Sequence, residues 1–212
     1  DEFVVFAGVA PGTYDFLVDR RGVTPAPVAQ ALHYPARCLG EDRVTRGNWD
    51  GVHGRDGHVL VAGGPGGEDV RVLPPWIAGV AFERGERVVW ATGADDPRAP
   101  APGPGRRGPR TAAALRTKDP EPTYQTMTAD VAAEAGREWT LALYFLDWDD
   151  AGRSVGVQLI EPVALTLLAP VQVVRSFRDG VYLSYRCRGP VRVRIDTITP
   201  PNATLTGMFF TG

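Results

Sequence analysis

The stretch WTLALYFL, residues 139–146, is an almost unbroken apolar run of the length typical of one β-strand. Its continuity predicts a strand that is buried on both faces or lies at the centre of a sheet. Further on, VRVRI at residues 191–195 alternates apolar and charged residues, which is typical of a strand with one face in a core and the other in water. The chain therefore has the pattern of a β-protein.

Other strand-like runs surround these two at a spacing of roughly 8–12 residues in the C-terminal half. Between residues 37 and 67, only 59–62 has the pattern of a strand, while TAAAL at 111–115 fits either a short helix or a strand. The total of about ten to thirteen strands predicts an all-β fold with little helix, an antiparallel β-sandwich of jelly-roll type. The remaining predicted strands are residues 70–73, 80–82, 88–91, 124–131, 155–160, 164–168, 171–177, 181–186 and 203–210.

Composition supports this fold class and excludes several others. The 212 residues include 25 Gly and 19 Pro, a richness in turn residues that argues against a helical bundle. The formal charge of −2 gives no reason to expect a nucleic-acid partner. No apolar run approaches the roughly 20 residues of a transmembrane helix, so no membrane span is expected.

The domain organisation is predicted from breaks in this pattern. DDPRAPAPGPGRRGP at about 95–109 lacks apolar bulk, so we expect a surface loop that does not pack, rather than a linker between domains. Residues 39–212 then form one β-sandwich domain. Residues 1–38 hold two short apolar runs and form an N-terminal strand pair or the tail of a preceding domain.

Two cysteines, Cys38 and Cys187, are too few for a disulfide scaffold or a zinc site. They either pair with each other or remain two buried free thiols.

Four motifs occur in a characteristic order: GEDRVTRGNWDGVHGRDGHVL at 40–60, LALYFLDWDDAGRS at 141–154, DGVYLSYRCRGPVRVRI at 179–195 and NATLTGMFF at 202–210. With these motifs the chain resembles the galactose-binding-like β-sandwich domains that serve as accessory modules in bacterial extracellular and carbohydrate-active proteins. The resemblance implies a module of a larger extracellular or cell-envelope protein, with an enzyme only as a neighbouring domain. It implies no catalytic residue in this chain.

The turn after residue 146 carries the first group of candidate site residues. Asp147 and Asp149 are expected to share a face, with Trp148 opposite and Arg153 following. One interpretation is sugar binding by these four residues, with carboxylates on hydroxyls and the indole on a pyranose face. A second is a Ca²⁺ site at Asp149 and Asp150. In a third, Trp148 is core and the aspartates cap the turn while Arg153 neutralises one of them.

The glycine-rich stretch GNWDGVHG at 47–54 carries the second group, Asn48 and Trp49. An exposed Trp49 would be a stacking platform for a sugar. A Trp49 tucked beneath the loop would close one end of the sandwich, with Asn48 fixing the turn.

Arginines recur near the C-terminal strands at Arg186, Arg188, Arg192 and Arg194. Outward guanidiniums of this kind suit acidic sugars. The alternative is a solvated strand face paired with acids on a neighbouring strand.

The function expected from these observations is a non-catalytic carbohydrate-binding or adhesive module. The alternative is a structural or interaction module that supports a neighbouring catalytic domain or self-assembly. A third possibility, a glycan-cleaving enzyme, would need paired carboxylates across a cleft.

Overall fold

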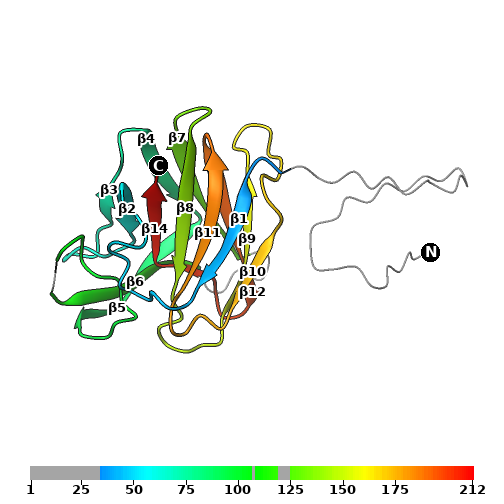
Figure 1. The fold of residues 1–212 in the computed structure, drawn as a ribbon. Coiled ribbons are helices and arrows are strands. Elements are labelled where there is room, and N and C mark those ends of the chain that lie inside the picture. The colour runs from blue at the N-terminus through cyan, green and yellow to red at the C-terminus, as the bar shows by residue number, and fades with distance from the viewer. Residues whose placement is uncertain (1–33, 107, 119–124) are drawn as a thin grey trace, which may run out of the picture. The chain divides into compact units, whose positions relative to one another are not determined.

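The computed structural model of the chain describes residues 34–106, 108–118 and 125–212 (Figure 1). All regular structure in these residues is β, in antiparallel sheets, and none of it is helical. The all-β prediction is thereby confirmed, whereas the strand pair expected within residues 1–33 lies outside the described part. No helix long and apolar enough to cross a membrane occurs in the described residues.

The largest sheet has six strands and contains the run from which the fold was predicted. Strand β8 (Glu138–Phe145) pairs with β11 on one side and β14 on the other, which confirms that WTLALYFL lies inside a sheet. The other strands are β1 (Arg37–Asp42), β11 (Val181–Arg188), β14 (Gly207–Thr211), β2 (Gly57–Leu60) and β3 (Val70–Val72), in the order β1-β11-β8-β14-β2-β3.

A second sheet has five strands and packs its apolar face against the first. In β12, the side chains of Val191, Val193 and Ile195 are buried, as the alternation predicted. The strands are β10 (Gln172–Arg175), β9 (Ser154–Ile160), β12 (Val191–Thr199), β7 (Thr126–Ala133) and β4 (Ile77–Glu83), in the order β10-β9-β12-β7-β4. The shared core of the two sheets makes the architecture a β-sandwich.

A third sheet of three strands consists of β13 (Thr204–Leu205), β6 (Arg110–Thr117) and β5 (Gly85–Ala94), in the order β13-β6-β5. The ambiguous TAAAL segment is therefore part of strand β6. Both cysteines are free thiols, with Cys187 buried in the sandwich core and Cys38 packed against it.

Two local predictions were wrong. Residues 164–168 form a turn rather than a strand, because the Glu161 carboxylate accepts hydrogen bonds from the amides of Val163 and Ala164. Leu165 has a left-handed φ of 57°, which lies outside the β region of backbone conformations. Strand β1 was missed because its sequence, RCLGED, is polar and mostly exposed at the sheet edge.

The Pro/Gly-rich loop packs, contrary to expectation. It covers part of the outer face of the six-stranded sheet, where Ala99 is fully buried and Ala101 is 8% exposed. Backbone hydrogen bonds fasten it to the preceding loop, from the amide of Gly47 to the carbonyl of Pro97 (2.9 Å) and from that of Ala101 to the carbonyl of Gly47 (2.8 Å). Backbone pairing and small side chains fit this segment closely onto the sheet, so apolar bulk is not needed.

Asp69 is a buried carboxylate that joins the six-stranded and three-stranded sheets. It accepts paired 2.7 Å hydrogen bonds from Arg87 and one of 2.7 Å from Arg71. Burial alone would raise the pKa of Asp69, but the hydrogen bonds from Arg87 and Arg71 outweigh it and lower this pKa to about 2. The charged carboxylate therefore stabilises the fold above pH 4.

Between about pH 4 and pH 2, protonation of Asp69 should remove about 2 kcal/mol of the free energy of unfolding. Urea unfolding at a series of pH values measures this loss. In Asp69→Asn, stability at pH 7 should be lower and the fall between pH 4 and 2 shallower, with Asp42, whose pKa is also about 2, accounting for part of the remaining slope. Parallel pH curves for the two proteins would contradict this assignment.

Candidate binding site

The turn that follows β8 is built around the carboxylate of Asp147. This side chain is buried and accepts hydrogen bonds from the amides of Ala151 (3.2 Å), Gly152 (2.9 Å) and Arg153 (3.2 Å). Three amides on one carboxylate fix the path of the turn. The aspartate therefore shapes the loop from the inside, as the capping interpretation expected.

Arg153 is the buried cation that neutralises this carboxylate. Its Nη1 donates to Asp147 and to Asp149, so the two aspartates do point to the same side. Its Nε donates to the side-chain oxygen of Asn202 at 2.9 Å. The hydrogen bond from Arg153 lowers the pKa of Asp149. The group is a buried ion pair with an exposed second carboxylate, which ties the turn to the segment before β13.

Trp148 is half-buried and packs against the apolar cluster on the outer face of the six-stranded sheet. The guanidinium of Arg98 sits 4.6 Å from the centre of its ring. Arg98 is in turn held by the carboxylate of Asp96 at 2.8 Å. One face of the indole is therefore already covered by a side chain from the Pro/Gly-rich loop.

The two residues suggested for calcium are each paired with an arginine. Asp149 bonds to Arg153, and the exposed Asp150 lies 3.4 Å from Arg178. Within the described residues, no three side chains among His, Cys, Asp and Glu are grouped so as to hold a metal ion. The guanidinium groups occupy the positions that a cation would need.

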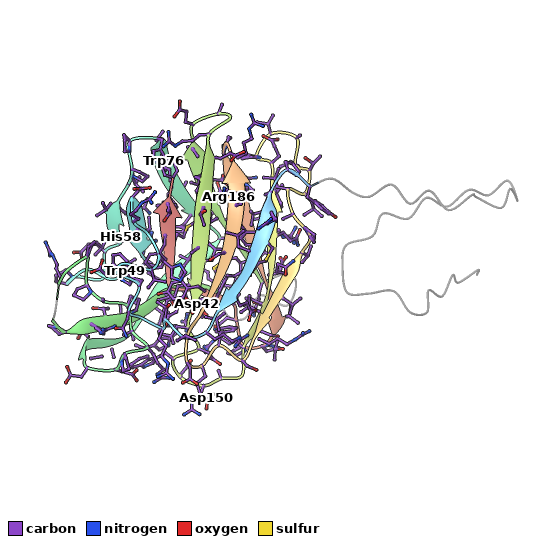
Figure 2. The ribbon with its side chains drawn as sticks, in the orientation of Figure 1. Asp42, Trp49, His58, Trp76, Asp150 and Arg186 are labelled. Atoms are coloured by element: carbon purple, nitrogen blue, oxygen red, sulfur yellow. The ribbon has the colours of Figure 1, made fainter. Side chains whose placement is uncertain are left out.

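Trp49 closes the outer face of the six-stranded sheet and is 1% exposed. Its Nε1 donates to the carbonyl of Ala101 at 2.9 Å, and its ring lies 4.5 Å from that of His58. Asn48 accepts a hydrogen bond from Arg110 at 2.5 Å. Trp49 is therefore tucked beneath the loop and is not an exposed stacking platform for a sugar. In Figure 2, Trp49 lies beside His58 and well away from Asp150, so the two groups do not form one site.

A hollow of about 470 Å³ opens beside the Asp147–Arg153 turn, at the end of the sandwich where Figure 2 labels Asp150. It is bordered by this turn, by the loop that follows β10 and by the last residue of β12. It is lined mostly by polar residues, namely Asp147, Asp150, Gly152, Arg153, Ser154, Arg175, Ser176, Arg178, Asp179 and Thr199.

Three strand ends place part of this lining in one row. Arg175 of β10 pairs in register with Ser154 of β9, and Ser154 pairs with Thr199 of β12. The neighbouring residue Val174 is buried, so the Arg175 side chain lies on the outer face of the sheet. The hydroxyls of Ser154 and Thr199 are hydrogen-bonded to each other.

The charges in the hollow are unevenly neutralised. Asp147 is paired with Arg153, and Asp150 with Arg178. Arg175 has no carboxylate partner among the described residues; only its backbone carbonyl is engaged, by Arg43 at 2.9 Å. The hollow therefore contains one guanidinium that is free to bind an incoming group.

Sequence reasoning identified one wall of this hollow and missed the others. Arg175, Ser176 and Arg178 belong to a short stretch, RSFRD, that looks like an ordinary turn, and Thr199 belongs to a strand end 50 residues from the turn. Nothing in their spacing signals proximity, because only strand pairing brings these segments together.

The arginine series near the C-terminus divides between the two sheets. On the five-stranded sheet, Arg192 makes paired 2.6 Å hydrogen bonds to Asp130, and Arg194 bonds to Asp196 at 2.9 Å. Arg192 thus pairs with an acid on the neighbouring strand β7, as the solvated-face interpretation expected, whereas the acid bound by Arg194 lies on its own strand. Arg186 lies on the six-stranded sheet, directly across from Arg37.

Comparison of the chain with protein-family models, curated proteins and solved structures gives no match. The function is therefore inferred from the hollow itself.

Proposed function

We propose that this chain is a non-catalytic carbohydrate-binding module whose hollow beside the Asp147–Arg153 turn binds a glycan. The observation that carries the proposal is the lining of that hollow, which combines carboxylates, guanidiniums and hydroxyls at the open end of a rigid β-sandwich. Carboxylates accept hydrogen bonds from sugar hydroxyls, while guanidiniums and hydroxyls donate to sugar oxygens. A few convergent polar groups on a preformed scaffold are typical of a small-molecule site.

The environment of the aspartates supports binding rather than hydrolysis. Glycoside hydrolysis needs two available carboxyl groups, one of them with a raised pKa. Asp147 is buried against three amides and Arg153, and hydrogen bonding from Arg153 lowers the pKa of Asp149. Neither carboxylate is arranged as a general acid.

The motif resemblance supports the wider context of the proposal. A galactose-binding-like jelly roll is consistent with two packed antiparallel sheets, and such a module would belong to a larger extracellular or cell-envelope protein with neighbouring domains as further partners. Binding is expected to be independent of Ca²⁺, because Asp149 and Asp150 both face arginines.

Isothermal calorimetry against a panel of neutral and acidic oligosaccharides, with and without Ca²⁺, tests this function. A hit should bind Asp150→Asn about tenfold more weakly, since a charged hydrogen-bond acceptor in the hollow is lost. Asp95→Asn is the matched control, because Asp95 is exposed and does not line the hollow.

The side chain of asparagine tolerates the left-handed φ of 55° at position 150, so this variant keeps the turn. No binding across the whole panel would overturn the proposal. Equal loss of affinity in both variants would place the glycan outside the hollow.

A further inference from the structure

A small apolar shelf, formed by Val173, Gly156 and Ile198, lies on the outer face of the five-stranded sheet. Gly156 pairs in register with Val173 on one side and with Asp196 on the other. The position that a Cβ would take at Gly156 lies 3.5 Å from Cδ1 of Ile198, so this isoleucine borders the bare backbone. Val173 and Ile198 are 38% and 47% exposed, and together with the buried Gly156 between them they form a small apolar surface.

The shelf lies next to the row formed by Arg175, Ser154 and Thr199. Along β9 and β10, the Gly156–Val173 pair and the Ser154–Arg175 pair are two positions apart, and side chains two apart on a strand share a face. The backbone positions of Arg175 and Ser154 therefore lie about 7 Å along the strands from those of Val173 and Gly156, on the same face.

This combination matches one chemical class of sugar. A pyranose has an apolar face made of C–H groups, and a uronic acid adds a planar carboxylate at its edge. A guanidinium fork fits a carboxylate with two parallel hydrogen bonds. Two of the three carboxylates that line the hollow are already paired with other arginines. Arg153 holds Asp147, and Arg178 holds Asp150.

The third carboxylate of the hollow belongs to Asp179. The hydrogen bonds that Arg98 donates to Asp96 and, to a smaller extent, the charge of Asp179 raise the pKa of Arg98. The guanidinium of Arg98 also donates to the backbone carbonyl of Arg178 at 3.2 Å. Asp179 therefore lies close enough to Arg98 for their charges to interact.

We propose that the hollow selects glycans containing uronic acid, with the sugar carboxylate on Arg175 and the apolar face of the sugar on the shelf formed by Val173, Gly156 and Ile198. This inference rests on the proposed function, because it names the ligand class of the same hollow.

Two pairs of probes test the charge preference by calorimetry. One is trigalacturonic acid and its methyl ester, and the other is a hyaluronan hexasaccharide and its methyl ester; each ester keeps the sugar backbone and removes the charge. We expect at least one acid to bind about tenfold more tightly than its ester, the ratio typical of one charge-assisted hydrogen bond. Arg175→Gln should abolish this ratio.

Arg186→Gln is the matched control, because Arg186 is likewise exposed and without a carboxylate partner among the described residues, but it lies on the other sheet. Acid and ester binding equally, or an unchanged ratio in Arg175→Gln, would overturn the inference while the proposed function stands. The same conclusion follows if only neutral or sulfated glycans from the panel bind. If no glycan binds at all, both the uronic-acid inference and the proposed function are overturned.

A larger side chain at Gly156 tests the proposed contact between the apolar face of the sugar and the shelf. Gly156→Val should weaken the acid and the ester by a similar factor of about ten and leave their ratio intact, because it blocks the shelf without touching Arg175. Position 156 has an ordinary strand backbone and room for a Cβ, so the fold should persist. Gly79→Val, at an open position of β4 in the same sheet, is the control.

Thermal unfolding of each variant separates loss of binding from loss of folding. Should Gly156→Val unfold, Ile198→Ser removes exposed apolar surface from the same shelf and should weaken both probes alike. Unchanged affinity in a folded shelf variant would overturn this contact.

Discussion

Asp147→Ala is expected to lower the free energy of unfolding by about 3–5 kcal/mol, the usual cost of removing one member of a buried ion pair. Both side chains of the pair are nearly inaccessible, at 2% for Arg153 and 3% for Asp147. The substitution leaves the Arg153 guanidinium with only the half-exposed Asp149 as a carboxylate partner. It also leaves the amides of Ala151 and Gly152 without their acceptor.

Chemical denaturation with tryptophan fluorescence measures this change. Asp150→Asn is the control, since its ion pair with Arg178 is exposed on both sides and should contribute less than about 1 kcal/mol. A loss below about 1 kcal/mol in Asp147→Ala would mean that Asp149 alone neutralises Arg153, and that the turn does not depend on the buried carboxylate.

Trp49→Ala should be comparably severe, with a loss of about 3–5 kcal/mol. The indole fills the space beneath the loop, against Phe209 at 5.2 Å and His58 at 4.5 Å between ring centres. Its removal leaves a cavity and frees the carbonyl of Ala101 from its only side-chain donor among the described residues. We therefore expect the Pro/Gly-rich loop to detach in this variant.

Trp148→Ala is the comparison for Trp49→Ala, because Trp148 is only half-buried and contacts Arg98 through its face. Its loss should be about 1–2 kcal/mol, combining partial burial with one cation–π contact. Limited trypsin digestion at Arg98 reports loop detachment, which should occur in Trp49→Ala and not in Trp148→Ala. An intact, fully stable Trp49→Ala protein would show that the loop docks without the Trp49 indole beneath it.

Strand periodicity predicted most of the sandwich, and the failures have physical causes. The central strand β8 is apolar on both faces because the loops cover the outer face of its sheet, and such a run is visible in the sequence. The edge strand β1 is not visible, since an edge strand buries little and its residues are free to be polar. Residues 164–168 show the opposite error, because apolar side chains there occupy a turn fixed by Glu161.

The candidate site was only half predictable for a related reason. The Asp147–Arg153 turn is local, so its spacing in the sequence already indicated that the aspartates share a side. Arg175 and Thr199 reach the same hollow through the pairing of β10, β9 and β12, which depends on the sheet order. Sequence alone also did not distinguish an exposed Trp49 from a buried one, because burial depends on the docked loop.

That docked loop shows that a segment of low-complexity sequence can be as intolerant of substitution as a packed core. A Cβ at Gly47 would lie 2.0 Å from the carbonyl oxygen of Ala99, so even alanine does not fit there without moving the loop. Residues 97–101 therefore constrain their neighbours as a hydrophobic core does, although their composition is that of a spacer. Exposed Gly108 and Pro109, further on, are a place in this loop where the chain can accept inserted residues or a fused tag.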